Sequence, residues 1–158
     1  MLPQEVAQLI GKADEVVIME VEKGAIKKFA DAIADLNPLY WDEEYARNSG
    51  FGTIVAPPGF FGWPTRWQCA MPFFSPLRQE VIDTLSQVGL SRILDGGIEY
   101  DFYHPVRAGD TLSSLSKIKD IRERETKTGK MVFSITETTY TNQNGDVVAK
   151  ARQTIIHR

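Results

Sequence analysis

The sequence predicts an α+β fold in which helices precede an antiparallel sheet. Early in the chain, apolar residues recur at the i, i+3, i+4, i+7 spacing of one helix face: Ile26, Phe29, Ala30 and Ile33. From Ile93 onward, apolar and polar residues alternate, as in strands with one buried face. The Asn144-Gly145 pair lies between two of these later segments and is a strong hairpin signal.

The N-terminal half is expected to contain several short elements. Residues 2–10 predict a short helix that ends near Gly11, and residues 16–21 predict a strand. A helix should begin near Gly24 and end at Asn37-Pro38, because proline disfavours the helical conformation in the residue before it. Acidic residues 42–44 then open a second short helix, and Gly50 is expected to be its left-handed cap.

After residue 62, the composition and the expected secondary structure of the chain change twice. Prolines and bulky apolar side chains crowd residues 63–79, which argues against a long regular helix there and is also typical of a dimer interface. Residues 80–90 have helical spacing. Strands are expected from residue 98 and from residue 131, with a charged hairpin tip at 123–130 and a closing strand at 147–156.

Composition and charge narrow the class of protein. A length of 158 residues with 42% hydrophobic and 25% charged residues suits one ordinary globular domain. A net charge of −3 without a clear basic cluster argues against a nucleic-acid partner. We see neither a signal peptide nor a long apolar run, so we expect a cytoplasmic protein with no membrane partner. The single Cys69 and the widely separated His104 and His157 predict no disulfide, zinc site or other metal site.

Three segments resemble the MaoC-like (R)-specific enoyl-thioester hydratase and dehydratase family, in its branch of FAS1-like dehydratase N-terminal domains. They read FADAIADLNPLYWDEEYAR, IVAPPGFF and DGGIEYDFYHPVRAGDTL, in the order that the family has them. The resemblance implies a single hot-dog domain over residues 1–158, in which an antiparallel sheet wraps around a central helix. It also implies that residues 111–122 form a strand with a bulge, although their apolar residues lie three apart and favour a helix.

The first part of the expected site is the polar turn after the first long helix. Catalytic members of the family carry Asp-x-Asn-Pro-x-His, whereas this chain has Asp35, Asn37 and then Tyr40 in the histidine's place. Histidine titrates near neutral pH, but a tyrosine with an ordinary pKa of about 10 is mostly a donor at pH 7. Asp35, Asn37 and Tyr40 are therefore the catalytic candidates, with Tyr40 a poor general base. From the residues alone, simple helix termination by Asp and Asn is the plainer interpretation.

The second part is a loop of small and apolar residues. We expect Ala56, Pro58, Gly59 and Phe60 to form an acyl and oxyanion pocket, because prolines can open a helix whose first amides have no acceptor. A tight turn is the plainer interpretation of this Pro-Pro-Gly run. His104, at a strand end before a proline, is a weaker ligand candidate.

The resemblance implies a subunit of an enoyl-CoA hydratase or, in reverse, a 3-hydroxyacyl-thioester dehydratase. In the first hypothesis the chain shapes the acyl pocket beside a catalytic MaoC-like subunit, in a heterodimer or heterotetramer. The alternatives are a self-sufficient homodimeric hydratase and a non-catalytic module that binds an acyl thioester. In each case the ligand is an acyl-CoA or acyl-ACP thioester, and no cofactor is expected.

Overall fold

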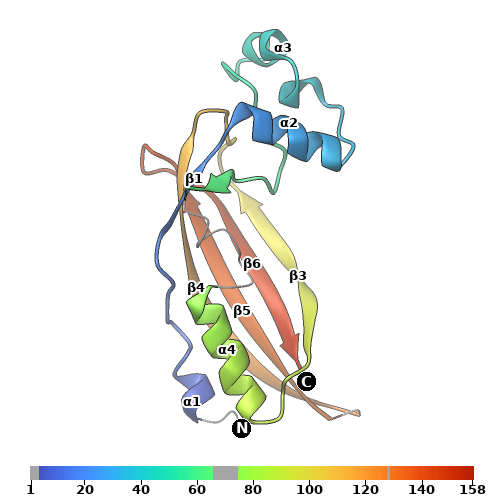
Figure 1. The fold of residues 1–158 in the computed structure, drawn as a ribbon, viewed down its shortest axis with the longest axis vertical. Coiled ribbons are helices and arrows are strands. Elements are labelled where there is room, and N and C mark those ends of the chain that lie inside the picture. The colour runs from blue at the N-terminus through green and yellow to red at the C-terminus, as the bar shows by residue number, and fades with distance from the viewer. Residues whose placement is uncertain (1–3, 66–74, 128) are drawn as a thin grey trace.

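A computed structural model describes residues 4–65, 75–127 and 129–158. Figure 1 shows an antiparallel sheet with helices α2 and α3 beyond one end and helix α4 along one face near the other. The sheet has six strands in the order β2-β1-β4-β5-β6-β3. The strands are β1 (Val17–Glu20), β2 (Trp63–Pro64), β3 (Ile93–Phe102), β4 (Thr111–Thr126), β5 (Gly129–Thr141) and β6 (Val147–His157). The helices are α1 (Gln4–Ala7), α2 (Lys23–Ala32), the 3-10 turn η1 (Pro38–Tyr40), α3 (Glu43–Asn48) and α4 (Pro76–Gln87).

The predicted α+β class and antiparallel sheet are confirmed. Most of the proline-rich segment 63–79, including Cys69, lies outside the described residues. Among the described residues, no helix is both long and apolar enough to cross a membrane. The same residues contain no cluster of three or more histidine, cysteine, aspartate or glutamate side chains that could hold a metal ion.

Strand β4 carries the bulge that its sequence required. It pairs with β5 almost from end to end, and the register shifts between Ile118 and Asp120. Because the bulge adds one residue, Ile118 and Ile121 both face inward although they lie three apart, whereas Leu115 is exposed. The hairpin between β5 and β6 also forms as predicted, with the Asn142 side chain accepting the amides of Asn144 and Asp146 at 3.0 Å each.

Helix α4 begins four residues before the predicted position. Ser75 caps it by accepting the Arg78 amide at 3.1 Å, and Pro76 occupies its first turn. The helix and α1 together bury one hydrophobic cluster against the sheet: Val6, Leu9, Leu77, Val81, Leu85, Leu90, Ile118, Ile121 and Val132. Twelve residues of helix span about 18 Å, whereas the sixteen residues of β4 span roughly 53 Å. Helix α4 therefore covers only part of the sheet.

At the other end of the sheet, α2 and η1 pack against the strands, and α3 lies beyond them next to η1. A second hydrophobic cluster forms there, which includes Val21, Ile26, Ala30, Tyr40, Ile54, Phe61, Leu112 and Val148. Helix α2 ends at Ala32 and not at Asn37-Pro38 as predicted, because Ala34 adopts a left-handed conformation with φ of 55°. The apolar stripe consequently ends early, and Ile33 is 50% exposed.

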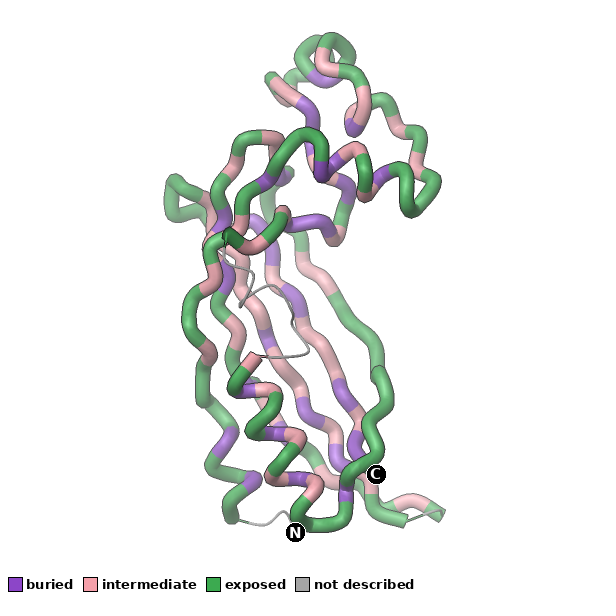
Figure 2. The backbone as a smooth tube through the Cα atoms, viewed as in Figure 1, coloured by how far each residue is buried: buried purple, intermediate pink, exposed green. Residues whose placement is uncertain are grey.

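Strand β3 departs from its predicted burial. Its alternation predicted one buried face, but Ile98 and Phe102 are 48% and 51% exposed. Figure 2 shows mostly exposed residues along this strand, next to the more buried β6. The reason is its position, because β3 pairs only with β6 and forms one edge of the sheet.

Candidate functional site

The turn between α2 and η1 is built by the two predicted polar side chains. Asp35 Oδ1 accepts the Asn37 amide at 3.0 Å, and Asn37 Oδ1 accepts the Leu39 amide at 3.1 Å. The Trp41 indole donates to the Asp35 carbonyl at 2.9 Å. Asp35 and Asn37 thus perform the structural role that Asp and Asn commonly have in turns. Within the described residues, the second carboxylate oxygen of Asp35 has no hydrogen-bond donor, and the Asn37 side chain also forms a hydrogen bond with Tyr40.

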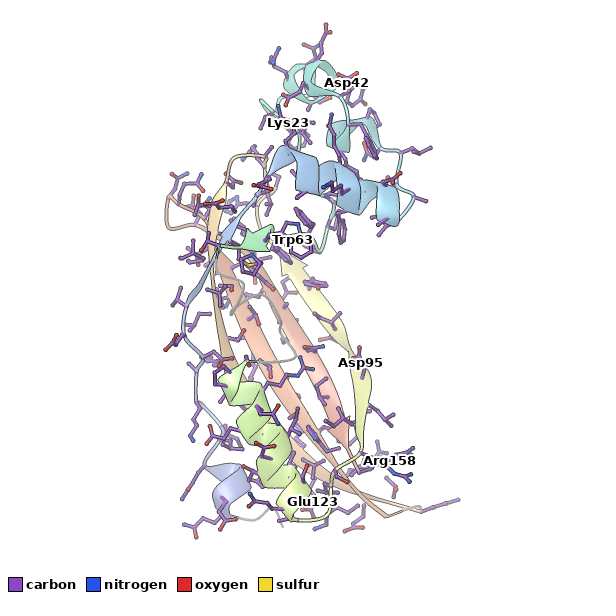
Figure 3. All side chains as sticks on the ribbon, viewed as in Figure 1. Lys23, Asp42, Trp63, Asp95, Glu123 and Arg158 are labelled. Carbon is purple, nitrogen blue, oxygen red and sulfur yellow. The ribbon has the colours of Figure 1, made fainter. Side chains whose placement is uncertain are left out.

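Helix α3 is tied to α2 and holds this turn in place. Asp42 caps α3 by accepting the Tyr45 amide at 3.0 Å, and Gly50 follows the helix at φ of 84°, as predicted. Lys23, at the start of α2, forms an ion pair with Glu43. Figure 3 labels Lys23 and Asp42 on this helical segment beyond the end of the sheet. The segment therefore positions Tyr40 against the second hydrophobic cluster.

Tyr40 is 8% exposed and has a raised pKa. Burial is the largest cause, the negative charge of Asp35 raises the pKa further, and a hydrogen bond with Asn37 partly offsets both. The three catalytic candidates are therefore close enough to influence one another. Because the pKa is raised above its ordinary value, the phenol stays protonated at neutral pH and acts as a hydrogen-bond donor.

The Pro-Pro-Gly run forms a tight turn, and the predicted helix start is wrong. The Phe60 amide donates to the Pro57 carbonyl at 3.0 Å, which places Pro58 and Gly59 at the centre of a β-turn. Gly59 has φ of 91°, as the second central residue of a type II turn requires. A residue in this conformation cannot continue a right-handed helix.

This turn leaves one amide for an oxyanion. The Ala56 amide donates to the Val106 carbonyl at 2.8 Å, the Phe60 amide closes the turn, and Pro58 has no amide hydrogen. Within the described part of the chain, the Gly59 amide has no acceptor. Of the four predicted pocket residues, Gly59 alone can therefore offer an amide to a carbonyl oxygen that gains negative charge.

A pocket of about 320 Å³ lies between η1, this turn and the segment after β3. The structure brings Tyr40 together with all four predicted loop residues, Ala56, Pro58, Gly59 and Phe60, on the pocket wall. Asp35 and Asn37 do not line it and lie in the adjacent turn. The volume falls at the lower end of the range for ligand sites in proteins, about 300–1,000 Å³.

Other aromatic rings pack against Phe60 and Phe61, two residues that line the pocket. Phe60 packs on Phe29 with ring centroids 5.1 Å apart and meets Trp63 edge-on at 6.4 Å. Trp63 is labelled beside β2 in Figure 3. Phe61 stacks on Tyr140 with centroids 3.9 Å apart. The turn that presents Gly59 thus has a packed base.

The segment at 102–106 forms the pocket wall that sequence reasoning largely missed. His104, which was only a weak candidate, is exposed and lines the same pocket as Tyr40 and Gly59. Its position follows from a bridge between Val55 and Arg107, reinforced by the bond from the Ala56 amide to the Val106 carbonyl. This pairing joins residues about 50 positions apart, so no local pattern could have revealed it.

Comparison with known proteins identifies the family. The family model described as FAS1-like, dehydratase domain region, matches residues 8–151. The chain belongs to this FAS1-like dehydratase family. A probable enoyl-CoA hydratase alpha subunit from Thermomonospora curvata is 32% identical over 132 residues, which cover 80% of this chain and 41% of that protein. A UPF0336 protein from Saccharopolyspora erythraea is 30% identical over 141 residues, which cover 88% of this chain and 81% of that protein. The chain spans less than half the length of the Thermomonospora relative.

Solved structures include chains with a similar fold. A chain in the crystal structure of the ChsH1–ChsH2 complex from Mycobacterium tuberculosis matches with a TM-score of 0.82 at 21% identity, covering 97% of this chain and 93% of that chain. A chain of the HadBC (3R-hydroxyacyl-ACP dehydratase) complex from the same organism matches with a TM-score of 0.62 at 24% identity, covering 90% and 95%. The predicted hot-dog fold is confirmed by these matches.

Proposed function

We propose that this chain is the pocket-forming subunit of a cytoplasmic enoyl-CoA hydratase or 3-hydroxyacyl-thioester dehydratase, in which a MaoC-like partner supplies the general base. The observation that carries the proposal is Tyr40, which occupies the histidine position of the family motif. Burial and Asp35 raise its pKa, so the phenol can donate a hydrogen bond but cannot take a proton from water near pH 7.

Two further observations support a partner subunit. The Thermomonospora relative is described as an alpha subunit, and the ChsH1–ChsH2 and HadBC structures are complexes. Strand β3 presents an open sheet edge with exposed Ile93, Leu94 and Ile98. An exposed apolar edge strand favours pairing with another chain.

In the proposed complex this chain binds and polarises the thioester. The Gly59 amide donates to the thioester carbonyl, and Tyr40 donates a hydrogen bond within the same pocket. The partner's base takes a proton from water as the water oxygen adds to the β-carbon, and it then returns this proton to the α-carbon of the enolate, which regenerates the base. The thiol carrier is CoA or an acyl-carrier protein.

The test is hydration of a panel of enoyl thioesters by the chain alone and with a MaoC-like partner. We expect turnover only with the partner. Asp35→Asn should change the activity of the complex by less than about threefold, because asparagine keeps the acceptor that the turn needs, whereas a catalytic acid or base contributes about 10²–10⁴-fold. Turnover by the isolated chain would contradict the proposal. Binding of thioesters without turnover, with every partner tried, would favour the non-catalytic module.

A self-sufficient homodimeric hydratase is the second candidate, and His104 favours it. This histidine lines the same pocket as Tyr40 and Gly59 and offers the imidazole that position 40 lacks. If the isolated chain hydrates enoyl thioesters, His104→Gln should reduce kcat by about 10²–10⁴-fold. If it does not, a gain of turnover in isolated Tyr40→His would mean that the site geometry is competent and that only the base is missing.

A further inference from the structure

A second pocket lies on the inner face of the sheet, which we define as the face that packs against α4. It has a volume of about 240 Å³ and is bordered by Ser75 and Arg78 of the α4 segment. We call it the inner pocket. The sheet contributes three apolar residues to it, Ile98, Ile118 and Ala151, and a larger set of polar ones: Tyr100, Ser116, Thr136, Thr138, Tyr140 and Gln153. The hydrophobic cluster around α4 and the one around α2 contain none of the Ser, Thr or Gln residues in this set.

Several of these groups retain hydrogen-bonding capacity. Ser116 and Thr138 bond to each other at 2.7 Å, and Arg78 donates to the Gln153 carbonyl oxygen at 3.4 Å. Within the described residues, the Tyr100 and Tyr140 hydroxyls, the Thr136 hydroxyl and the Gln153 amide group have no hydrogen-bond donor or acceptor opposite them. None of these atoms is fully buried, so water can reach them in the free chain. An occupant that excludes this water has to pair them, so the pocket is suited to a polar occupant.

Packed aromatic rings lie between the inner pocket and the candidate site, which have no lining residue in common. Phe61 lines the candidate site, and it stacks on Tyr140 at 3.9 Å and packs on Tyr100 at 5.8 Å. Both tyrosines line the inner pocket. With 240 Å³, the inner pocket is smaller than the roughly 300–1,000 Å³ of complete ligand sites. It therefore suits one end of a longer molecule.

We propose that the inner pocket binds the distal end of the acyl group and selects an acyl chain that carries a neutral oxygen function, a hydroxyl or a ketone. This inference rests on the proposed function, which places the thioester at Gly59. A plain hydrocarbon tail would leave the tyrosine, threonine and glutamine groups unpaired, and sites built to bond a hydroxyl discriminate strongly against analogues that lack it. Asp14 and Arg78 both line the pocket, so its charges offset each other and give a carboxylate no net attraction.

The test measures binding and not turnover. Saturated acyl-CoAs, which cannot be hydrated, are compared in matched pairs of several lengths, with plain tails or with a terminal hydroxyl or ketone. Titration calorimetry uses the full chain, alone and with its partner. We expect the oxygenated member of the best pair to bind about three- to tenfold more tightly, the effect of one net hydrogen bond. Equal or tighter binding of the plain tail would overturn the inference.

Two threonines of β5, one on each face of the sheet, give a matched control. Thr136→Val and Gln153→Leu remove polar groups from the inner pocket and should reduce the preference for oxygenated tails toward unity. Thr139→Val makes the same change on β5 but on the opposite face of the sheet, and should keep the preference. Thermal midpoints verify that each variant is folded. An unchanged preference in folded Thr136→Val and Gln153→Leu would overturn the inference.

The outcomes separate this inference from the proposed function. If plain and oxygenated acyl-CoAs bind equally while the complex hydrates enoyl thioesters, the inference fails and the proposed function stands. If the preference and its loss in the variants are observed without turnover in any complex, the inference stands and the hydratase proposal fails. If no thioester binds with or without a partner, both fail.

Discussion

The surroundings of His157 determine its protonation state. This histidine is next to the C-terminus, yet it is 1% exposed. Its Nε2 lies 2.9 Å from the Ser134 hydroxyl, and its Nδ1 has no partner in the described part of the chain. Burial, with a smaller contribution from the Arg78 charge, lowers the pKa of His157 to about 4. The residue is therefore neutral and structural under ordinary conditions.

This shift predicts a loss of stability in mild acid. Between pH 6.5 and about 4, the unfolded chain binds a proton at His157 that the folded chain does not, so the free energy of unfolding falls as pH falls. The contribution should be about 2 kcal/mol between pH 7 and pH 5, measured by urea unfolding. His157→Gln should remove it, whereas the exposed-site control His104→Gln should retain it. An identical pH dependence in all three proteins would refute the prediction.

At the scale of elements, the chain after the Gly59 turn passes very close to β1. A Cβ atom at Gly62 would lie 2.4 Å from the Glu20 carbonyl oxygen, and Gly62 has φ of 85°. Gly59 has a similar φ of 91°, but a Cβ there would meet nothing within 4 Å. The two glycines therefore share one backbone requirement and differ in steric freedom.

Matched alanine substitutions should separate these two effects. Gly59→Ala should cost about 1–2 kcal/mol of unfolding free energy, the cost of a left-handed conformation for a residue with a Cβ. Gly62→Ala should cost about 3 kcal/mol or more, because overpacking against the β1 backbone is added. Urea unfolding measures both. Equal losses would mean that β1 moves away at little cost and that the close approach is not required.

Local chemistry in the sequence predicted the elements whose causes are local. The Asn142–Gly145 turn and the Gly50 cap needed only neighbouring residues, and both formed as predicted. The end of α2 was not predictable, because Ala34 rather than a glycine adopts the left-handed conformation. The strand at Ile118 and Ile121 required the family resemblance, because its bulge disguises the alternation.

The residues of the candidate site were likewise predictable only from local sequence or from the family resemblance. The resemblance identified Tyr40 and the Pro-Pro-Gly run identified Gly59, and the two residues line one pocket. The sequence could not show that the Ala56 amide is already bonded to Val106, or that His104 lines the same pocket, because both facts depend on contacts between distant parts of the chain. The roles of Asp35 and Asn37 in catalysis remain predictions.

For the whole molecule, the open edge at β3 predicts association. Leu94→Lys places a charge on this edge at a residue that is 42% exposed, and should reduce assembly with the partner or with a second copy. Leu115→Lys is the matched control, because Leu115 is 41% exposed but lies on the interior strand β4. Light scattering after size-exclusion chromatography measures the assembly. Intact assembly in Leu94→Lys, with native circular dichroism, would exclude this edge as the interface.

The opposite edge of the sheet has a different character. Strand β2 has only two residues, and one of them is Pro64, which has no amide hydrogen to offer. Within the described residues, a strand that adds to β3 therefore finds no equivalent template at the far edge of the sheet. If β3 pairs with another chain, growth by edge pairing should stop after one addition, which would favour a closed pair over open-ended fibres.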